Sequence, residues 1–475
     1  MKITARALAL VVMISGFLGF IQLPAAQASQ VDTLIEKLVE KKILTRLDAE
    51  SIRSEIETAE KKDYKLQVKN STPWIDGLTS KGDIRLRYEA FNRETEDNRT
   101  ATGDAGGTDR NRFRFRARWG LEKKFSDEWK AGFRIASGGG TTDATSTNQS
   151  LDGEFGLKDV FIDQAYGIYT PTKRFKDIIP SIQTVEIGAG KVQNPYDRDK
   201  WNTNIIWDSD VTPEGIYEKV DFRLMDDAAN EAYWDLNTLQ GQWIVDEDSD
   251  QAPGDQEMQS YGFGTTYQWK KSTNASFKFT YYDWQEYADF IRSGSALANN
   301  TGGNDRTVDQ FKIVNFYSEI NFEMPTWWWG TQPVKLFGDY AFNSGAENNP
   351  DGSTDEELAN VAQRQDEEDA FSLGLTLGKS KEEKDWAFTY EYLYIEPNAV
   401  VGNFAESDLG LGFANNKGHR LGFKYMVLKN LELNLTAWMV ERVNKTISTF
   451  GAADNRVAGD DDQVLRTQAD LVWKF

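Results

Sequence analysis

The residues best suited to chemistry in this sequence are four arginines at every second position of residues 110–121, RNRFRFRARWGL. They are Arg112, Arg114, Arg116 and Arg118, and the side chains between them are aromatic or apolar. A one-sided row of guanidinium groups creates a positive potential that attracts anions and orients dipolar solutes. The same row can instead pair with carboxylates and only add rigidity. The segment is compatible with both interpretations.

Enzymatic chemistry has little support in the sequence. The chain has no cysteine and no Gly-x-Ser-x-Gly pattern, and its single histidine is His419. A serine nucleophile normally needs a neighbouring base, most often histidine, and zinc sites need several histidine or cysteine ligands. A catalytic pair of carboxylates stays open, because acidic residues are frequent. We predict no enzyme, no metal and no cofactor.

The arginines must lie on a β-strand, because successive side chains of a strand point to opposite faces and the period here is two. In a soluble sandwich the apolar face would cover the core and the arginines would meet water. In an outer-membrane barrel the polarity is inverted, with apolar groups toward lipid and charged groups toward a wet interior. One strand cannot distinguish these folds, so the rest of the chain must.

The composition argues against nucleic acid as a partner. The 475 residues include 54 Lys and Arg against 75 Asp and Glu, a net charge of −21, whereas phosphate contacts need a basic surface. Aromatic residues make up 13% of the chain, yet they alternate with polar residues and do not form continuous apolar runs. A soluble protein would normally bury so many aromatic residues in such runs.

The chain before the alternating region divides into three segments. Residues 1–28 have the pattern of a secretory signal peptide, with a basic start, an apolar run over 7–23 and small residues before a cleavage site after Ala28. The alternative is a retained membrane anchor. Residues 29–63 have a helical pattern, which predicts either a solvated helix pair on a barrel rim or a self-associating coiled coil in the periplasm. Residues 64–79 are a predicted linker.

From residue 80 to residue 475 the sequence alternates in sixteen segments, most of them about 9–11 residues long, the length of a tilted strand that crosses a bilayer. The predicted strands are 82–91, 110–121, 128–136, 159–169, 183–192, 215–225, 232–245, 258–269, 275–285, 311–323, 334–343, 370–378, 385–395, 418–428, 430–441 and 464–475. Short turns alternate with long surface loops such as 92–109, 286–309 and 396–417, as in outer-membrane barrels. We predict an all-β membrane protein, an antiparallel 16-stranded transmembrane β-barrel (80–475) preceded by a short helical periplasmic segment.

The most specific motif of the chain lies in residues 188–216, where GK-x-x-NP is followed by WDSD-x-TPEG. Together with residues 110–121, the helical preface and the terminal Phe475, this motif resembles the bacterial "putative porin" family over nearly the whole mature chain. The resemblance implies a sixteen-stranded porin in the cell outer membrane that forms homotrimers and lets small hydrophilic solutes or ions diffuse passively. It implies no particular solute.

Residues 193–214 of this motif would form the third surface loop, counted from a periplasmic N-terminus. In sixteen-stranded porins the third loop commonly folds inward and narrows the channel, and the tryptophan and isoleucine side chains of this loop need a surface to pack on. The alternative is a surface loop with ordinary charges. The candidates for a constriction are Asp197, Arg198, Asp199, Lys200, Trp201, Asp208 and Asp210.

Alternation also predicts which arginines would line a channel. Basic side chains outnumber acidic ones on the predicted inner faces, so we expect a mild preference for anions. The rival function is a secreted or outer-membrane β-rich protein that binds carbohydrate without channel activity, for which the tryptophans of residues 327–330, WWWG, would suit sugar stacking. The predicted channel-lining arginines are Arg85, Arg87, Arg112, Arg114, Arg116, Arg118 and Arg134.

Overall fold

The computed structural model describes residues 75–93, 110–138, 144–247, 255–287, 310–327, 330–346, 367–409, 414–444 and 463–475, together with Val39 and Val308. The chain divides into two units, Met1–Asp76 and Gly77–Phe475. The predicted signal peptide, all of the predicted helical segment except Val39, and most of the predicted linker lie outside the described residues. The fold described below is that of the second unit.

In its described residues, the second unit is one antiparallel sheet of seventeen strands, of which β4 (Gln149–Ser150) has only two residues. Short helices α4 (Thr172–Lys176) and α5 (Pro195–Arg198) and a 3-10 turn, η2 (Gly402–Phe404), lie in its connections. No helix in the described ranges is long and apolar enough to span a membrane. The other sixteen strands are β1 (Leu78–Arg93), β2 (Arg110–Lys124), β3 (Trp129–Ser137), β5 (Val160–Tyr169), β6 (Ile182–Lys191), β7 (Glu214–Asp227), β8 (Ala232–Asp246), β9 (Gln256–Lys270), β10 (Thr273–Gln285), β11 (Phe311–Thr326), β12 (Gly330–Asn343), β13 (Asp369–Gly378), β14 (Trp386–Ile395), β15 (Asn416–Leu428), β16 (Leu431–Arg442) and β17 (Val464–Lys474).

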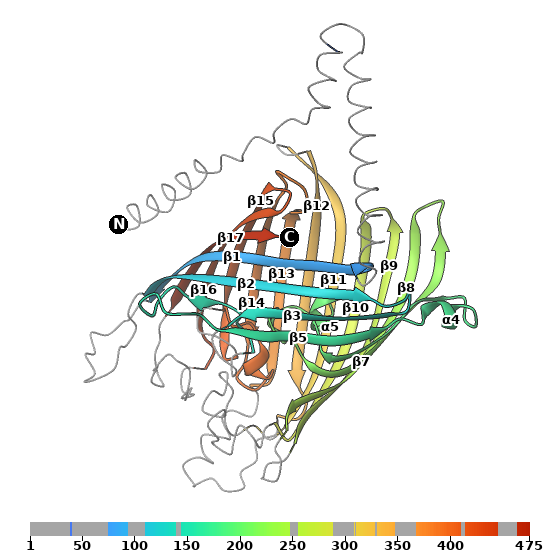
Figure 1. The fold of residues 1–475 in the computed structure, drawn as a ribbon, viewed down its shortest axis with the longest axis horizontal. Helices are drawn as coiled ribbons and strands as arrows, with labels where there is room; N and C mark the ends of the chain where they lie inside the picture. The colour runs from blue at the N-terminus through green and yellow to red at the C-terminus, as the bar shows by residue number, and fades with distance from the viewer. Residues whose placement is uncertain are drawn as a thin grey trace. The chain divides into compact units, whose positions relative to one another are not determined.

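The sheet closes on itself because the first strand pairs with both the second and the last. Arg87 on β1 lies opposite Arg114 on β2 on one side and opposite Asp470 on β17 on the other. Figure 1 shows blue β1 and red β17 side by side. The remaining long strands pair with their neighbours in the chain, and β3 pairs directly with β5. A closed ring leaves no sheet edge with unpaired backbone groups, as a lipid environment requires.

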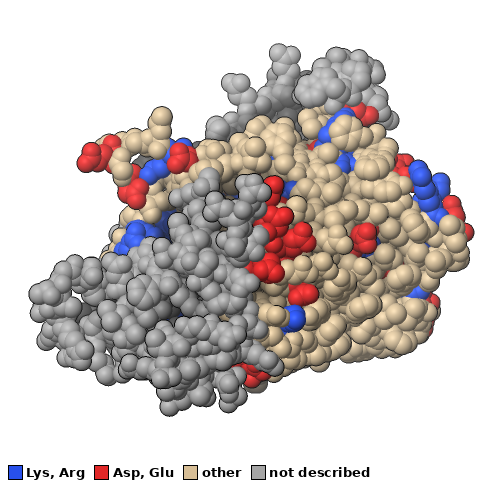
Figure 2. Space-filling view, turned by 90° about the horizontal axis from the view of Figure 1, so that it is seen from below, with Lys and Arg blue, Asp and Glu red and all other residues tan. Residues whose placement is uncertain are grey.

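Exposure along the strands is inverted relative to that in a soluble protein. On β1, Ile84 is 44% exposed, whereas Arg87 is 4% exposed and Glu89 is fully buried. On β2, Phe113 is 49% exposed, while Arg116, three residues further along and on the other face, is buried. Figure 2 shows a broad area of one face with few charged side chains. Apolar side chains therefore point out of the ring, where lipid surrounds a membrane barrel, and charged side chains point into the ring.

Each of the sixteen predicted segments corresponds to one long strand, so the prediction of a 16-stranded antiparallel barrel is confirmed. The boundaries differ by a few residues. β1 begins at Leu78, before the predicted start of the barrel at residue 80, and β2 continues to Lys124. The sequence pattern does not predict β4, because two residues are too few to show a period.

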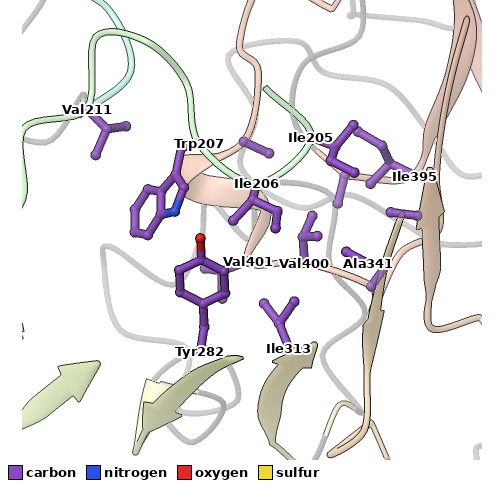
Figure 3. Close-up of a cluster of buried hydrophobic side chains, with 14 of the residues drawn as sticks. Ile205, Ile206, Trp207, Val211, Tyr282, Ile313, Ala341, Ile395, Val400 and Val401 are labelled. Atoms are coloured by element: carbon purple, nitrogen blue, oxygen red, sulfur yellow. The ribbon is translucent and has the colours of Figure 1, made fainter. Parts of the chain in front are cut away.

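Two long connections pack against the inner face of the ring. They are the β6–β7 loop (192–213) and the described part of the β14–β15 loop (396–409 and 414–415). Figure 3 shows Ile206 and Trp207 of the first loop and Val401 of the second facing Tyr282 and Ile313 of the wall. Burying an aliphatic or aromatic side chain stabilises by about 1.5–3 kcal/mol, so this shared cluster holds both loops inside.

Candidate functional site

The β6–β7 loop begins with a sequence that fits a tight first turn. Asn194 accepts a hydrogen bond from the Tyr196 N–H at 3.0 Å, and Pro195 suits the first helical position of α5. The turn ends at Lys200, whose φ of 54° lies in the left-handed region. Lys278 on β10 donates to the carbonyl of Lys200 at 2.7 Å and to that of the preceding residue at 2.5 Å. The wall therefore satisfies the carbonyls at the end of the turn.

Trp201 anchors the loop on the inner face of β9. The indole is 1% exposed and lies over Gly262, where an added Cβ would stand 2.8 Å from the ring. The ammonium group of Lys278 lies 5.0 Å from the ring centroid, close enough for a cation–π contact. A glycine inside a strand weakens it unless another group needs the space, and here Trp201 occupies it.

Polar contacts fix the next residues of the loop on β10 and β12. Asn202 donates to the Tyr282 hydroxyl at 2.8 Å. Thr203 donates to the Asp339 carboxylate from its N–H at 2.5 Å and from its hydroxyl at 2.9 Å. Because polar groups of this segment, the Thr203 N–H among them, find partners on the wall, the segment can lie inside the ring.

The β14–β15 loop joins the β6–β7 loop inside the ring. The Asp208 N–H donates to the Phe404 carbonyl at 2.7 Å, and the Glu406 N–H donates to the Asn204 carbonyl at 3.1 Å. The Asp208 carboxylate also accepts hydrogen bonds from the N–H and hydroxyl of Ser407, at 2.9 and 2.7 Å. Backbone and side-chain bonds thus connect the two loops, and we call them together the loop insert.

The second member of the loop insert was predicted to lie on the surface. The expected surface loop over 396–417 is wrong for residues 399–409, because much of this stretch is buried. Ala399 and Val400 are fully buried and Val401 is 2% exposed. The available signal is this short apolar run within a polar loop, since an apolar run needs a surface to cover it.

Seven arginines from three adjacent strands converge beside the loop insert, and five of them pair closely with carboxylates of the wall. Arg116 and Arg118 lie 2.8 and 2.7 Å from Asp83, and Arg87 lies 2.7 Å from Asp470. Glu89 pairs with the two others. For these five the geometry matches the ion-pair interpretation. The seven, called here the arginine cluster, are Arg85, Arg87, Arg112, Arg114, Arg116, Arg118 and Arg466.

One carboxylate from each loop enters the arginine cluster. Asp408 of the β14–β15 loop lies 2.8 Å from Arg87 and 2.6 Å from Arg466. Asp210 of the β6–β7 loop lies 3.2 Å from Arg118. These contacts, called here the loop latch, tie the loop insert to β1, β2 and β17. The apolar cluster ties it to the opposite part of the wall.

The acids of the loop insert occupy two different electrostatic environments. Burial raises the pKa of Asp208 well above its ordinary value, and the charges of Glu406 and Asp210 raise it further. Burial also raises the pKa of Glu406. Burial acts in the same direction on Asp210 and Asp408, but the arginines beside them outweigh it and lower both pKa values. The latch acids are therefore held ionised, while the acids between the loops favour the neutral form.

Part of the space inside the ring is open to water. Lys424 on β15 is exposed although it lies on the inner face, the same face as Arg420, which pairs with Glu391. Lys200 on the loop insert is also exposed. Charged inner side chains with access to solvent are expected for a lumen and not for a packed core.

The model of the "putative porin" family matches residues 94–314 and 307–449. The chain belongs to this family. Porins are non-enzymatic channels, so family and fold together make the protein a porin-type barrel. Among solved structures, it is similar to a mutant porin of Rhodopseudomonas blastica (9% identity, TM-score 0.39, covering 84% of this chain and 100% of that chain) and to Salmonella typhi OmpF in complex with daunomycin (10% identity, TM-score 0.42, covering 84% and 98%). No curated protein matches the chain.

The predicted site residues of this porin occupy several distinct places. Arg134 on β3 pairs with Asp163 on β5. Arg198 lies 2.7 Å from Glu186 on the wall. Asp197 pairs with Lys200 at 2.8 Å. Asp199 lies 3.0 Å from Lys219 on β7. The structure thus brings Asp210 to the arginine cluster, places Asp208 between the two loops, and uses Arg198, Asp199 and Trp201 to anchor the loop.

The single histidine of this porin lies on the outer face of the barrel. His419 Nδ1 is 2.9 Å from the Tyr390 hydroxyl, and its ring packs beside Tyr392. In the ranges that the structure describes, no group of three or more His, Cys, Asp or Glu side chains could hold a metal ion. The aromatic contacts give His419 a packing role on the outer face.

Proposed function

We propose that this porin forms a water-filled channel in the outer membrane through which small hydrophilic solutes or ions diffuse passively, with a mild preference for anions. The observation that supports this function is the inverted wall, apolar outside and charged inside, around an interior in which Lys424 and Lys200 meet water. Diffusion needs no catalytic group, so the wall and the loops only filter by size and charge.

We propose that the loop insert forms the constriction. It is tied to the arginine cluster by Asp210 and Asp408 and to the opposite wall by Trp201 and its apolar neighbours. Solutes would therefore pass beside the insert, along the open space that contains Lys200 and Lys424. Positively charged side chains at a narrow point of a channel attract anions and repel cations, so we expect anions to pass more readily. The predicted arginines, Arg134 included, would shape the field from the wall.

Planar-bilayer recording tests this function directly. The purified protein should produce stepwise conductance, and reversal potentials in a salt gradient should indicate anion preference. Lys424→Glu should shift the reversal potential toward cations, because it reverses a charge inside the ring. Lys384→Glu is the matched control, since Lys384 is an exposed residue of the turn between β13 and β14. Absence of conductance would reject the channel, and a clear cation preference of the wild type would reject the proposed selectivity.

The second candidate function is carbohydrate binding without channel activity. Trp327, at the turn between β11 and β12, is 91% exposed and could stack on a sugar ring. The same residue suits a membrane interface, where tryptophan is enriched. A chain that stays monodisperse without detergent and does not conduct would favour the binding protein, whereas a detergent requirement favours the membrane barrel.

We also propose export with cleavage after Ala28 and assembly into homotrimers. The export proposal is supported by the sequence pattern of residues 1–28, and the trimer is implied by the family resemblance. N-terminal sequencing of the protein purified from membranes should begin at Ser29. The mass of the detergent-solubilised complex, corrected for bound detergent, should equal three chains.

A further inference from the structure

Two members of the arginine cluster lack the close carboxylate that the other five have. Arg85 comes no nearer to a carboxylate than 3.9 Å, to Asp470, and Arg114 no nearer than 3.9 Å, to Glu89, among the described residues. The other five each have a carboxylate within 2.8 Å. Arg85 and Arg114 therefore differ from their neighbours in lacking a close counter-charge.

A neutral side chain stands where these two arginines would be expected to meet an acid. Arg85 donates to the Asn148 side-chain oxygen at 2.6 Å, and Arg114 donates to the Asn148 carbonyl at 3.2 Å and to the Ser146 hydroxyl at 3.3 Å. Both arginine side chains are only 12% exposed. In both, the Nε–H is buried without a hydrogen-bond acceptor in the described part of the chain.

The arginine cluster as a whole also has more positive than negative charges. Seven guanidinium groups contact five carboxylates, those of Asp83, Glu89, Asp210, Asp408 and Asp470, which leaves an excess of two positive charges. Unpaired buried charges are costly, and a group with unused donors gains most from an added counter-charge. An anion bound here would balance the excess positive charge and accept hydrogen bonds from the unused donors.

We propose that a small oxyanion, a carboxylate or an inorganic phosphate, binds between Arg85 and Arg114 beside Asn148. The two arginines occupy diagonal positions on paired strands, since Arg85 lies opposite Arg116 and Arg87 lies opposite Arg114. Diagonal positions are about 7–8 Å apart, a distance that two long side chains close around one oxyanion. The planar donor pairs of guanidinium groups match carboxylate and phosphate oxygens better than a halide.

An anion can bind at this site whether or not the barrel conducts, so the site is independent of the proposed channel function. The test is thermal unfolding of the purified full chain in detergent, with sodium phosphate or sodium acetate replacing sodium chloride at constant ionic strength. A ligand that binds only the folded state raises the unfolding midpoint with concentration. We expect such a rise for the wild type, and its loss in Arg85→Gln and in Arg114→Gln.

Asn148→Asp provides the sharpest variant, because it places a carboxylate within the 2.6 Å contact that Arg85 already makes. We expect its midpoint without phosphate to rise and its dependence on phosphate to disappear. A purely structural asparagine would leave the phosphate dependence as in the wild type. Arg134→Gln is the matched control, since Arg134 has its own partner in Asp163, and it should keep the dependence.

Three outcomes overturn the inference: no oxyanion-dependent rise in the wild type, an equal rise in chloride alone, or an Asn148→Asp protein that keeps the full phosphate effect. If phosphate acts and acetate does not, the site takes phosphate only; the reverse result assigns it to carboxylates. Bilayer recordings on the same preparations test conductance independently of oxyanion binding. A non-conducting barrel with the oxyanion effect would keep the site and reject the channel.

Discussion

The loop latch predicts a measurable change in gating when Asp408 is replaced by asparagine. Asp408 is held by Arg87 at 2.8 Å and by Arg466 at 2.6 Å, while each arginine keeps a second carboxylate on the wall. The substitution removes one negative charge from the latch but leaves neither arginine without a partner. The barrel should therefore fold, and the loss should fall on the docking of the β14–β15 loop.

The magnitude follows from the two contacts that change. A hydrogen bond to a charged group contributes about 1.5–3 kcal/mol, and an asparagine oxygen retains part of one of the two bonds. A net loss of about 2–3 kcal/mol in docking is therefore expected, since the retained wall partners limit the cost. Because about 1.4 kcal/mol corresponds to a factor of ten, excursions of the loop should become roughly 30- to 150-fold more frequent.

Single-channel recording at high time resolution measures these excursions as brief conductance steps. Asp408→Asn should show them far more often than the wild type at the same voltage and salt. Asp152→Asn is the control, because it removes one carboxylate at an exposed position that contacts Lys158 and not the latch. Equal step frequencies in Asp408→Asn and the wild type, with an intact barrel by circular dichroism, would refute the latch.

Three further predictions concern the packing of Trp201 on β9, the contact between the two loops at Asp208, and the outer face of the barrel at Phe113. Trp201→Ala removes a packed indole over Gly262, which costs about 3–5 kcal/mol, and trypsin should then cleave faster at Lys200. The raised pKa of Asp208 means that its protonation favours the docked state. Conductance noise should therefore decrease as the pH is lowered through this raised pKa, and it should increase again only in stronger acid, where the latch acids protonate. Asp208→Asn should remove the first change. Phe113→Lys places a charge on the outer face and should cost about 2–4 kcal/mol of folding into lipid vesicles, measured by urea titration.

Matched variants keep these predictions specific. Trp119→Ala removes an indole from the outer face, where it is 42% exposed, and should leave the trypsin pattern unchanged. Asn237→Lys adds the same charge as Phe113→Lys but on the inner face, where it should be tolerated in vesicles. Equal losses for both lysine variants would contradict the assignment of the two faces.

The barrel can be predicted from the amino-acid pattern, because the information needed for it is local. A period of two over about ten residues identifies a strand, and the alternation of short and long connections identifies its direction across a membrane. The inverted polarity followed from residues 110–121, where Phe113 and Arg114 face opposite ways whatever the partner strands are. The sixteen strands therefore came out with errors of only a few residues at their ends.

The contacts of the charged residues, in contrast, depend on how distant segments come together in the folded chain. Arg87 finds Asp470 from the far end of the chain because the ring closes there, and Asp408 from a loop that local pattern assigns to the surface. No spacing along the chain relates these positions. Trp201 and Gly262 show the same limit, since a glycine in a strand signals a close approach but not the group that approaches. The partners of inward side chains depend on which segments fold into the ring, and that is decided by packing between residues far apart in the sequence.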